Sequence, residues 1–302
     1  MSGDAMSPRP AAAPKSANCR LIDWTSKPPL PETSIKAPHL KNYDRIYAST
    51  KPAPREETPE EALAAYLAAY DAAGASHVVI KARDLESTFG VKITNEDVAA
   101  FCARHGERFI GFAGVDPHKG PQALRELEHA VKELGLRGLN LQCFEHKLAI
   151  NDPRLYPLYA KCVELDIPVN IHCGVNFSTE SSMAFGRPYL LDEVMIAFPG
   201  LRACAAPPGW PWVHELIAVA WKHVNLTIGL VFVRPKYLTV PESGYGPLLQ
   251  YGKKLLRDRI IFGSGFPTLP LASALAEIDE LPIDDETKDL WRYGNAARLL
   301  RL

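Results

Sequence analysis

The sequence predicts an α/β protein, a single-domain (β/α)8 TIM barrel. Short apolar segments alternate with longer segments that have the spacing of amphipathic helices. The short segments are apolar almost throughout, as strands buried on both faces must be. Eight such strand–helix units follow one another within about 280 residues, which suits one barrel. The alternative is a doubly wound open sheet, but no phosphate-cradling glycine motif follows any of the strands.

Each element is placed by its pattern and by its start and stop signals. Strands are expected at residues 20–24, 77–82, 108–115, 137–142, 167–174, 201–206, 224–231 and 259–264. Helices are expected at 59–74, 94–106, 121–135, 152–166, 188–198, 211–223, 244–256, 269–280, 284–292 and 294–301. Thr58 and Thr94 are N-cap residues, and Gly74 ends the first helix. Prolines between residues 28 and 57 predict a long loop after the first strand.

The composition sets the protein class. The hydrophobic fraction of 47% supports a large core, and the net charge of −1 gives no field for nucleic acid. Apolar runs are well short of the ~20 residues of a membrane span, so no membrane association is expected. Residues 1–18, rich in Pro, Ala and Ser, predict a disordered arm without a signal peptide, followed by the barrel at 19–302. Six scattered cysteines without a C-x-x-C pair indicate reduced thiols in a cytoplasmic protein.

Polar residues gather at the expected carboxyl ends of the strands, where barrel enzymes place their active sites. These residues are Asp23, Thr25 and Lys27 after the first strand, Lys81 after the second, Asn140 and Gln142 after the fourth, His172 and Asn176 after the fifth, Trp210 after the sixth, and Ser264 after the eighth. Strand alternation predicts that Asp23, Thr25 and Lys27 share one face. Asn170, two residues before His172, shares the face of that histidine.

Several segments resemble one known family in order and spacing. They are LIDWTSKPP, NEDVAAFCARHGERFIGFAGVDP, ELGLRGLNLQ, DPRLYPLYAKCVELDIPVNIHCG, FPGLRACAAPPGWPWVHELIAVAWKHVNL, RIIFGSGFP and YGNAARLL. Together they resemble the amidohydrolase-related proteins of the metal-dependent hydrolase superfamily, which include lactone hydrolases and aromatic acid decarboxylases. The resemblance implies a (β/α)8 barrel and a homo-oligomer.

The chain departs from the metal-binding pattern of that family. The family's His-x-His pair falls on Thr25 and Lys27, its sixth-strand histidine on Pro207, and its eighth-strand aspartate on Gly265. Only His172 is retained. Divalent metals need several deprotonated ligands, so the departures predict no catalytic metal and no other cofactor.

The expected function is that of a metal-independent hydrolase of a small organic acid lactone or ester. His172 is the expected acid/base, Lys27 stabilises negative charge in place of a metal, and Asp23 is either a base or a structural partner of a lysine. The expected substrate-binding residues are Thr25, Lys81, Asn140, Gln142, Asn176, Trp210 and Ser264. A lyase that uses lysine and histidine, either a decarboxylase or a carbon–carbon cleaving enzyme, is nearly as well supported. A degenerate barrel without turnover is the third alternative.

Several of these residues also have a purely structural interpretation. Lys27 is equally consistent with a solvated position in the proline-rich loop. Asn140 and Gln142 are more often satisfied polar core than ligand contacts. Trp210, in the sequence PGWPW, either walls the pocket or belongs to a rigid turn.

Overall fold

Eight parallel strands form the barrel in the computed structural model, which describes residues 20–35, 37–50 and 57–302. They are β1 (Leu21–Ser26), β2 (Ala75–Lys81), β5 (Phe109–Phe112), β6 (Leu139–Leu141), β7 (Val169–Ile171), β8 (Ala203–Ala205), β9 (Leu226–Leu230) and β10 (Ile260–Phe262). Several are shorter than expected, because ladder pairing ends before the apolar run does. The predicted arm at residues 1–18 lies outside the described residues.

The strands pair in two sheets that meet at both seams. One sheet has the order β1-β2-β5 and the other β10-β9-β8-β7-β6. Isolated parallel bridges join Ala113 to Leu139 at one seam and Ser26 to Phe266 at the other. At the second seam Lys27 N also donates to Phe266 O at 3.0 Å. The predicted α/β barrel fold is therefore confirmed.

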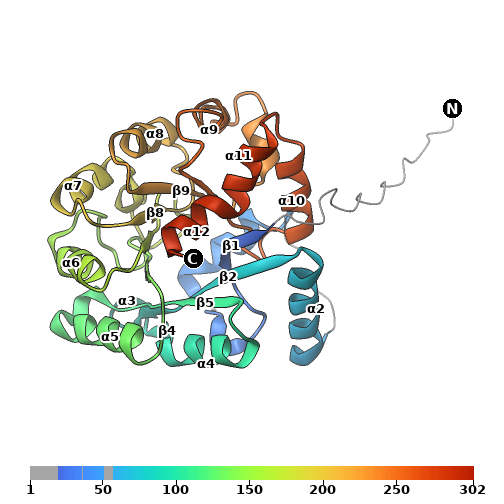
Figure 1. Cartoon of the computed structure of the whole chain (residues 1–302). Coiled ribbons are helices and arrows are strands. Elements are labelled where there is room, and N and C mark those ends of the chain that lie inside the picture. The colour runs from blue at the N-terminus through green and yellow to red at the C-terminus, as the bar shows by residue number, and fades with distance from the viewer. Residues whose placement is uncertain (1–19, 36, 51–56) are drawn as a thin grey trace.

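Helices surround the strands and cover their outer faces (Figure 1). They are α2 (Pro59–Ala72), α4 (Asn95–His105), α5 (Pro121–Lys132), α6 (Tyr156–Glu164), α7 (Leu190–Ala197), α8 (Val213–Lys222), α9 (Gly246–Gly252), α10 (Leu271–Asp279) and α11 (Asp285–Asp289), followed by a π-helical turn at Leu290–Gly294. The last helix, α12 (Asn295–Leu300), lies across the centre of the ring (Figure 1) and packs on the inner core. Thr58 caps α2 in a capping box, and Thr94 caps α4, as predicted. Within the described ranges, no helix combines the length and apolarity needed to cross a bilayer.

Two additions to the barrel were not expected from the sequence. The long loop after β1 contains α1 (Lys41–Ile46), and a small hairpin of β3 (Arg83–Leu85) and β4 (Val91–Ile93) follows β2, with α3 (Glu86–Phe89) between its strands. Short 3-10 turns lie at Pro31–Thr33, Pro38–Leu40, Pro117–Lys119, Pro153–Leu155, Met183–Gly186 and Pro235–Leu238. Both additions follow the carboxyl ends of barrel strands.

Successive side chains of each strand point to opposite faces of the barrel wall, so the core has two layers. The inner layer fills the barrel with apolar residues that include Ile22, Trp24, Val79, Phe112 and Cys204. The Trp24 and Phe112 rings meet edge to face with their centroids 5.3 Å apart. The outer layer packs the strands against the helices. The polar residues at the carboxyl ends of the strands therefore lie above a layer of apolar side chains that fills the barrel.

Candidate active site

The side chain of Lys81, at the end of β2, lies on the inner wall of the barrel. Its Nζ donates hydrogen bonds to Thr25 Oγ1 at 2.5 Å and to Asn170 Oδ1 at 3.2 Å. The same atom lies 5.7 Å from the centroid of the Trp24 ring. Burial lowers the pKa of Lys81 to about 7, and the positive charge of Lys27 acts in the same direction. Thus Lys81 holds an amine that is half neutral near physiological pH.

A chain of amides fixes the wall around this amine. Asn170 Oδ1 accepts a second hydrogen bond from Trp24 Nε1 at 2.8 Å, and Asn170 Nδ2 donates to Asn140 Oδ1 at 3.0 Å. Gln142 Nε2 donates to the same oxygen of Asn140 at 3.0 Å. Asn140 Nδ2 in turn donates to the carbonyl of Ala82 at 3.1 Å. The amide of Asn140 is thus satisfied by protein, which favours a positioning role for this residue.

Lys27 follows β1 and stands at the mouth of the barrel. Its Nζ lies 5.8 Å from the centroid of the Phe232 ring, and its side chain is partly buried. Its charge lowers the pKa of Lys81, although burial has the larger effect. The structure brings Lys81 into contact with Thr25, and Lys27 follows directly after the strand that carries Thr25.

His172 follows β7 and is 6% exposed. Its ring centroid lies 4.4 Å from that of Phe144. Burial lowers the pKa of His172 to about 4, while the charge of Glu145 opposes this shift and that of Arg83 adds to it. The imidazole is neutral at pH 7, so it is suited to accept a proton or a hydrogen bond. It is poorly suited to act as a cationic acid.

Asp23 and Ser264 face the helix layer instead of the mouth. Between Asp23 and Ser26, β1 advances by three residues while β2 advances only from Val78 to Ile80, which is a bulge. Asp23 accepts hydrogen bonds from Tyr70 Oη at 2.7 Å and from Ser264 N and Oγ at 2.8 and 2.5 Å. The prediction that Asp23 shares a face with Thr25 and Lys27 is wrong, because the bulge reverses the alternation. Ser264 lies in the same buried cluster through its hydrogen bonds to Asp23, and its expected contact with the substrate stays a prediction.

Asn176 and Trp210 lie in the loops after β7 and β8. Asn176 Nδ2 donates to the carbonyl of Ser182 at 3.0 Å, which ties the loop to itself. Trp210 is 38% exposed, and its indole packs against Gly244, where an added Cβ atom would lie 3.0 Å from Nε1. The structure thus gives Asn176 a loop contact and places Trp210 against the glycine-rich loop at 243–246.

A chain of aromatic rings spans the space between Lys27 and His172. Starting from Phe232, which faces Lys27, successive centroids lie 6.3, 6.2, 5.6 and 6.4 Å apart through Tyr47, Phe177, Tyr43 and Phe144. Phe144 then packs against His172. The two tyrosines belong to the proline-rich loop, Tyr43 in α1 and Tyr47 directly after it. This loop therefore supplies part of the cover of the mouth.

A buried ion cluster that the sequence did not reveal anchors the same loop. Glu145 is fully buried and forms an ion pair with Arg83. His39 Nε2 lies 2.9 Å from Glu145 Oε1, and the His39 ring stacks on Phe89 with centroids 3.7 Å apart. Arg83 and His39 hold the pKa of Glu145 at about 2 against the opposing effect of burial. An arginine after β2 and a glutamate after β6, two strands separated by β5, were the available signal, but nothing in the sequence paired them.

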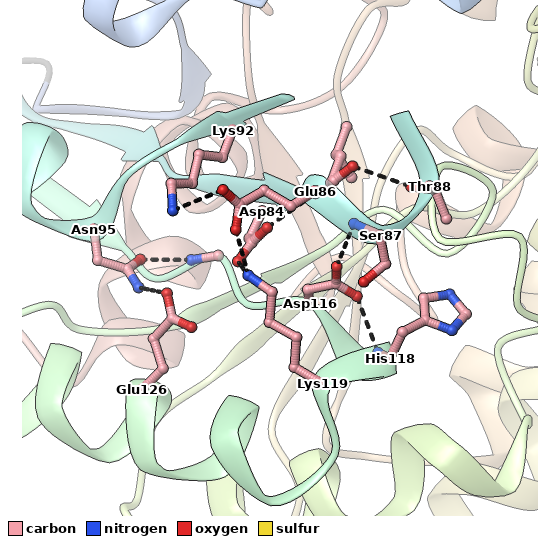
Figure 2. A network of polar contacts seen from close by, with 12 residues as sticks. Asp84, Glu86, Ser87, Thr88, Lys92, Asn95, Asp116, His118, Lys119 and Glu126 are labelled. Atoms are coloured by element: carbon pink, nitrogen blue, oxygen red, sulfur yellow. Dashed lines mark hydrogen bonds and ion pairs between the residues drawn. The ribbon is translucent and has the colours of Figure 1, made fainter. Parts of the chain in front are cut away.

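A second polar cluster surrounds the β3–β4 hairpin (Figure 2). Lys119 Nζ lies 2.5 Å from Asp84 Oδ2 and 2.6 Å from Glu86 Oε2. Glu86 also pairs with Lys92 at 3.0 Å. The carboxylate of Asp116 accepts hydrogen bonds from backbone N–H groups, including that of Ser87 at 2.9 Å. Each lysine in this cluster has a carboxylate of the protein as its partner.

The donor set at the mouth does not fit a divalent metal. In the family pattern these positions carry histidines and an aspartate, but Thr25, Lys27, Pro207 and Gly265 occupy them here. Across the described ranges, no three His, Cys, Asp or Glu side chains are grouped so that they could hold a metal ion. The ammonium group of Lys27, at one of these positions, also repels a cation.

Comparisons with known proteins agree with the fold. The gamma-resorcylate decarboxylase of Rhodococcus jostii is 28% identical over 106 residues, a match that covers 32% of each chain. A solved structure of a TIM-barrel protein from Bordetella bronchiseptica is similar with a TM-score of 0.79 and 29% identity, covering 93% of this chain and 98% of that one. The 5-carboxyvanillate decarboxylase of Sphingomonas paucimobilis has a TM-score of 0.63 at 18% identity, covering 94% and 100%.

The prediction of a hydrolase is contradicted. The gamma-resorcylate decarboxylase, a curated relative, is a lyase and not a hydrolase. The match spans only about a third of the length of that relative, so it does not by itself assign the relative's activity to this chain. A family model described as amidohydrolase matches residues 38–302, which is most of the sequence. The chain therefore belongs to the amidohydrolase family.

Proposed function

We propose that this protein is a lyase that decarboxylates a small carboxylic acid. The observation that carries the proposal is the pair of lysines at the barrel mouth. Lys81 binds only the neutral oxygens of Thr25 and Asn170, and no carboxylate of the described chain forms an ion pair with it. A buried amine beside a second cation favours an anionic ligand. The decarboxylase relatives supply the reaction class.

The reaction needs a site that binds the substrate and controls charge. Loss of CO2 leaves an electron pair on carbon, so a positive group near the acceptor end of the substrate stabilises the transition state. Lys27 and Lys81 supply this charge from the protein. His172, neutral at pH 7, orients the substrate by accepting a hydrogen bond. Asn140 and Asn170 hold the amine of Lys81 in place.

The lysines take the electrostatic role that a metal has in related sites. A solved 5-carboxyvanillate decarboxylase from Novosphingobium aromaticivorans contains manganese. In this chain the matching positions hold no ligand set, and Lys27 places an ammonium group there. We therefore assign no step to a metal ion.

The aromatic rings over the mouth support a substrate with an apolar or planar body. A solved 2,6-dihydroxybenzoate decarboxylase binds 2,6-dihydroxybenzoate, a small organic acid. The rings of Tyr43, Tyr47 and Phe177 offer faces and edges for a comparable ligand. Exclusion of water beneath them strengthens the contacts of both ammonium groups.

Incubation with a panel of carboxylic acids tests the proposal. The panel contains hydroxybenzoates, aliphatic 3-oxo acids and matched lactones, and CO2 release and ring opening are measured side by side. We expect CO2 from at least one acid and no ring opening, with product in D2O carrying deuterium at the carbon that bore the carboxylate. The Lys222→Met variant, at an exposed helix position, is the control. Lactone opening without CO2 release would refute the proposal.

A further inference from the structure

We infer that Lys81 forms a covalent imine with the ketone carbonyl of a 3-oxo carboxylic acid and that this imine is the intermediate that loses CO2. The inference rests on the proposed function and deepens it, because it names the nucleophile and the substrate class. It starts from the position of the amine at the end of β2, on the inner wall and partly exposed toward the mouth.

The contacts of Lys81 differ from those of Lys119, which pairs with the carboxylates of Asp84 and Glu86. The two hydrogen-bond partners of Lys81, Thr25 Oγ1 and Asn170 Oδ1, are neutral acceptors. Asp23, the nearby carboxylate, lies on the opposite face of β1 and is already bonded to Tyr70 and Ser264. The amine is therefore oriented by the protein without being neutralised by it.

The surroundings of Lys81 favour its neutral, nucleophilic form. The Lys81 Nζ lies 5.7 Å from the centroid of the Trp24 ring, and burial, with a smaller effect from the charge of Lys27, lowers the pKa of the amine. Desolvation together with an adjacent cation is the arrangement that activates lysines for imine formation. An amine with a pKa near 7 has a neutral fraction roughly a thousandfold larger at pH 7 than an ordinary lysine.

The substrate class follows from the chemistry of the imine. A 3-oxo acid has one carbon between its ketone and its carboxylate, so the iminium formed at the ketone can accept the electron pair that loss of CO2 leaves on that carbon. Lys27, with its Nζ 5.8 Å from the centroid of the Phe232 ring, is the cation proposed for the carboxylate. We place the ketone carbon at the Lys81 amine and the carboxylate toward Lys27.

The step balances without an added oxidant or cofactor. The Lys81 nitrogen bonds to the ketone carbon and passes one proton to the carbonyl oxygen, which takes a second proton from solvent and leaves as water, giving an iminium. The bond between the carboxylate and the α-carbon then breaks, and its electron pair enters the iminium to give an enamine and CO2. The α-carbon takes up a proton from water in the site. Water adds to the resulting iminium, which releases the ketone and restores the amine.

Reductive trapping tests the imine directly. The full-length protein is incubated with acetoacetate and cyanoborohydride at pH 7, digested and mapped by mass spectrometry. We expect a reduced adduct on Lys81, no adduct at this position in Lys81→Met, and an unchanged adduct in Lys222→Met. An adduct spread over exposed lysines at the level of Lys222 would overturn the inference.

A second experiment measures the reactivity of Lys81 in the wild-type protein, so that its result does not depend on whether a Lys81 variant folds. The diketone 2,4-pentanedione forms a stable enaminone with neutral amines, and its rate on wild-type protein is measured from pH 5 to 10. We expect Lys81 to react at least about 100-fold faster than Lys222 at pH 7, and Lys27→Met to move the midpoint of the Lys81 rate to higher pH. Equal rates at the two lysines would refute the activated amine.

The two proposals fail differently. Release of CO2 from acids that lack a ketone, without an adduct at Lys81, would refute the imine and leave the decarboxylase intact. An adduct at Lys81 with no CO2 from any acid of the panel would refute the decarboxylase and leave a carbonyl-binding amine.

Discussion

Lys81 and Lys119 lie after the neighbouring strands β2 and β5 and are held in opposite ways. Lys119 is clamped between the carboxylates of Asp84 and Glu86, which raise its pKa (Figure 2). Lys81 has two neutral oxygens as partners, and burial lowers its pKa to about 7. Lys119 therefore completes a structural network of ion pairs. Lys81 instead remains available to bind an anionic ligand.

This difference in partners distinguishes a structural polar cluster from a ligand-binding site. A protein gains stability when each partly buried charge meets its opposite, as in the hairpin cluster. A charge left without such a partner costs stability, so it persists where a ligand uses it. Lys81, whose hydrogen-bond partners are the neutral oxygens of Thr25 and Asn170, has this second character.

Replacing each of the two lysines by methionine gives the strongest test of the comparison. We expect Lys81→Met to lower kcat/KM for decarboxylation by about 10³-fold or more, within the range for loss of a catalytic group, and to leave stability unchanged or higher. Lys119→Met is expected to keep activity within about threefold but to lose about 1–3 kcal/mol of unfolding free energy, because Asp84 loses its partner. Steady-state kinetics and urea titration measure both. The reverse pattern would reject the division into site and structure.

His172→Asn is expected to have the next largest effect. The amide keeps one hydrogen-bond acceptor but removes the imidazole, so we expect kcat to fall by about 10²-fold with the fold retained. His129→Gln, an exposed change on α5, is the control. Unchanged turnover would remove His172 from the mechanism and restrict the site to the lysine side of the mouth.

Lys27→Met is expected to weaken binding of acidic ligands. The loss should be about 1.5–3 kcal/mol, the scale of a hydrogen bond to a charged group. Lys27→Arg should restore little of it, because a planar guanidinium does not replace a compact ammonium. Calorimetric titration with an inhibitory carboxylic acid measures both variants. Binding that is as tight in Lys27→Met as in wild type would place this lysine outside the site.

Acid should destabilise the protein through its buried histidines. Burial lowers the pKa of His146 and of His172 to about 4. Between about pH 6.5 and 4 the unfolded chain binds a proton at each of these positions and the folded chain does not, so stability falls as pH drops through this window. We expect His146→Gln to flatten that slope and His129→Gln to leave it unchanged, in unfolding curves taken at several pH values. An equal slope in both variants would contradict the burial argument.

Metal removal is expected to have the smallest effect. Because the mouth presents ammonium groups in place of ligands, protein purified without chelator should contain well under one equivalent of zinc or manganese. Chelation followed by dialysis should change activity by less than about twofold. A stoichiometric metal whose removal abolishes activity would show that ligands beyond those identified by the family pattern bind it.

Local sequence signals were enough for much of the fold. Thr58 and Thr94 mark helix starts because their hydroxyl groups bond the first free N–H groups, an interaction that depends only on neighbours in the chain. The apolar strands likewise follow from burial on both faces. The positions of Lys27, Lys81 and His172 at strand ends were predictable because parallel strands of a barrel end on one side.

Other parts of the site were decided only by tertiary structure. The bulge in β1 turns Asp23 to the helix layer, where Tyr70 and Ser264 bind it, and alternation alone predicts the opposite face. The pairing of His39 with Glu145 spans 106 positions in the chain, and no local pattern specifies it. The pKa of Lys81 is set by burial over Trp24 and by the charge of Lys27, neither of which a residue type encodes. The sequence by itself determined which elements form and at which strand ends the polar residues lie, because those depend on periodicity and nearest neighbours. Which side chains face the mouth, and with what charge, depended on contacts between distant segments that exist only after the barrel has closed around them.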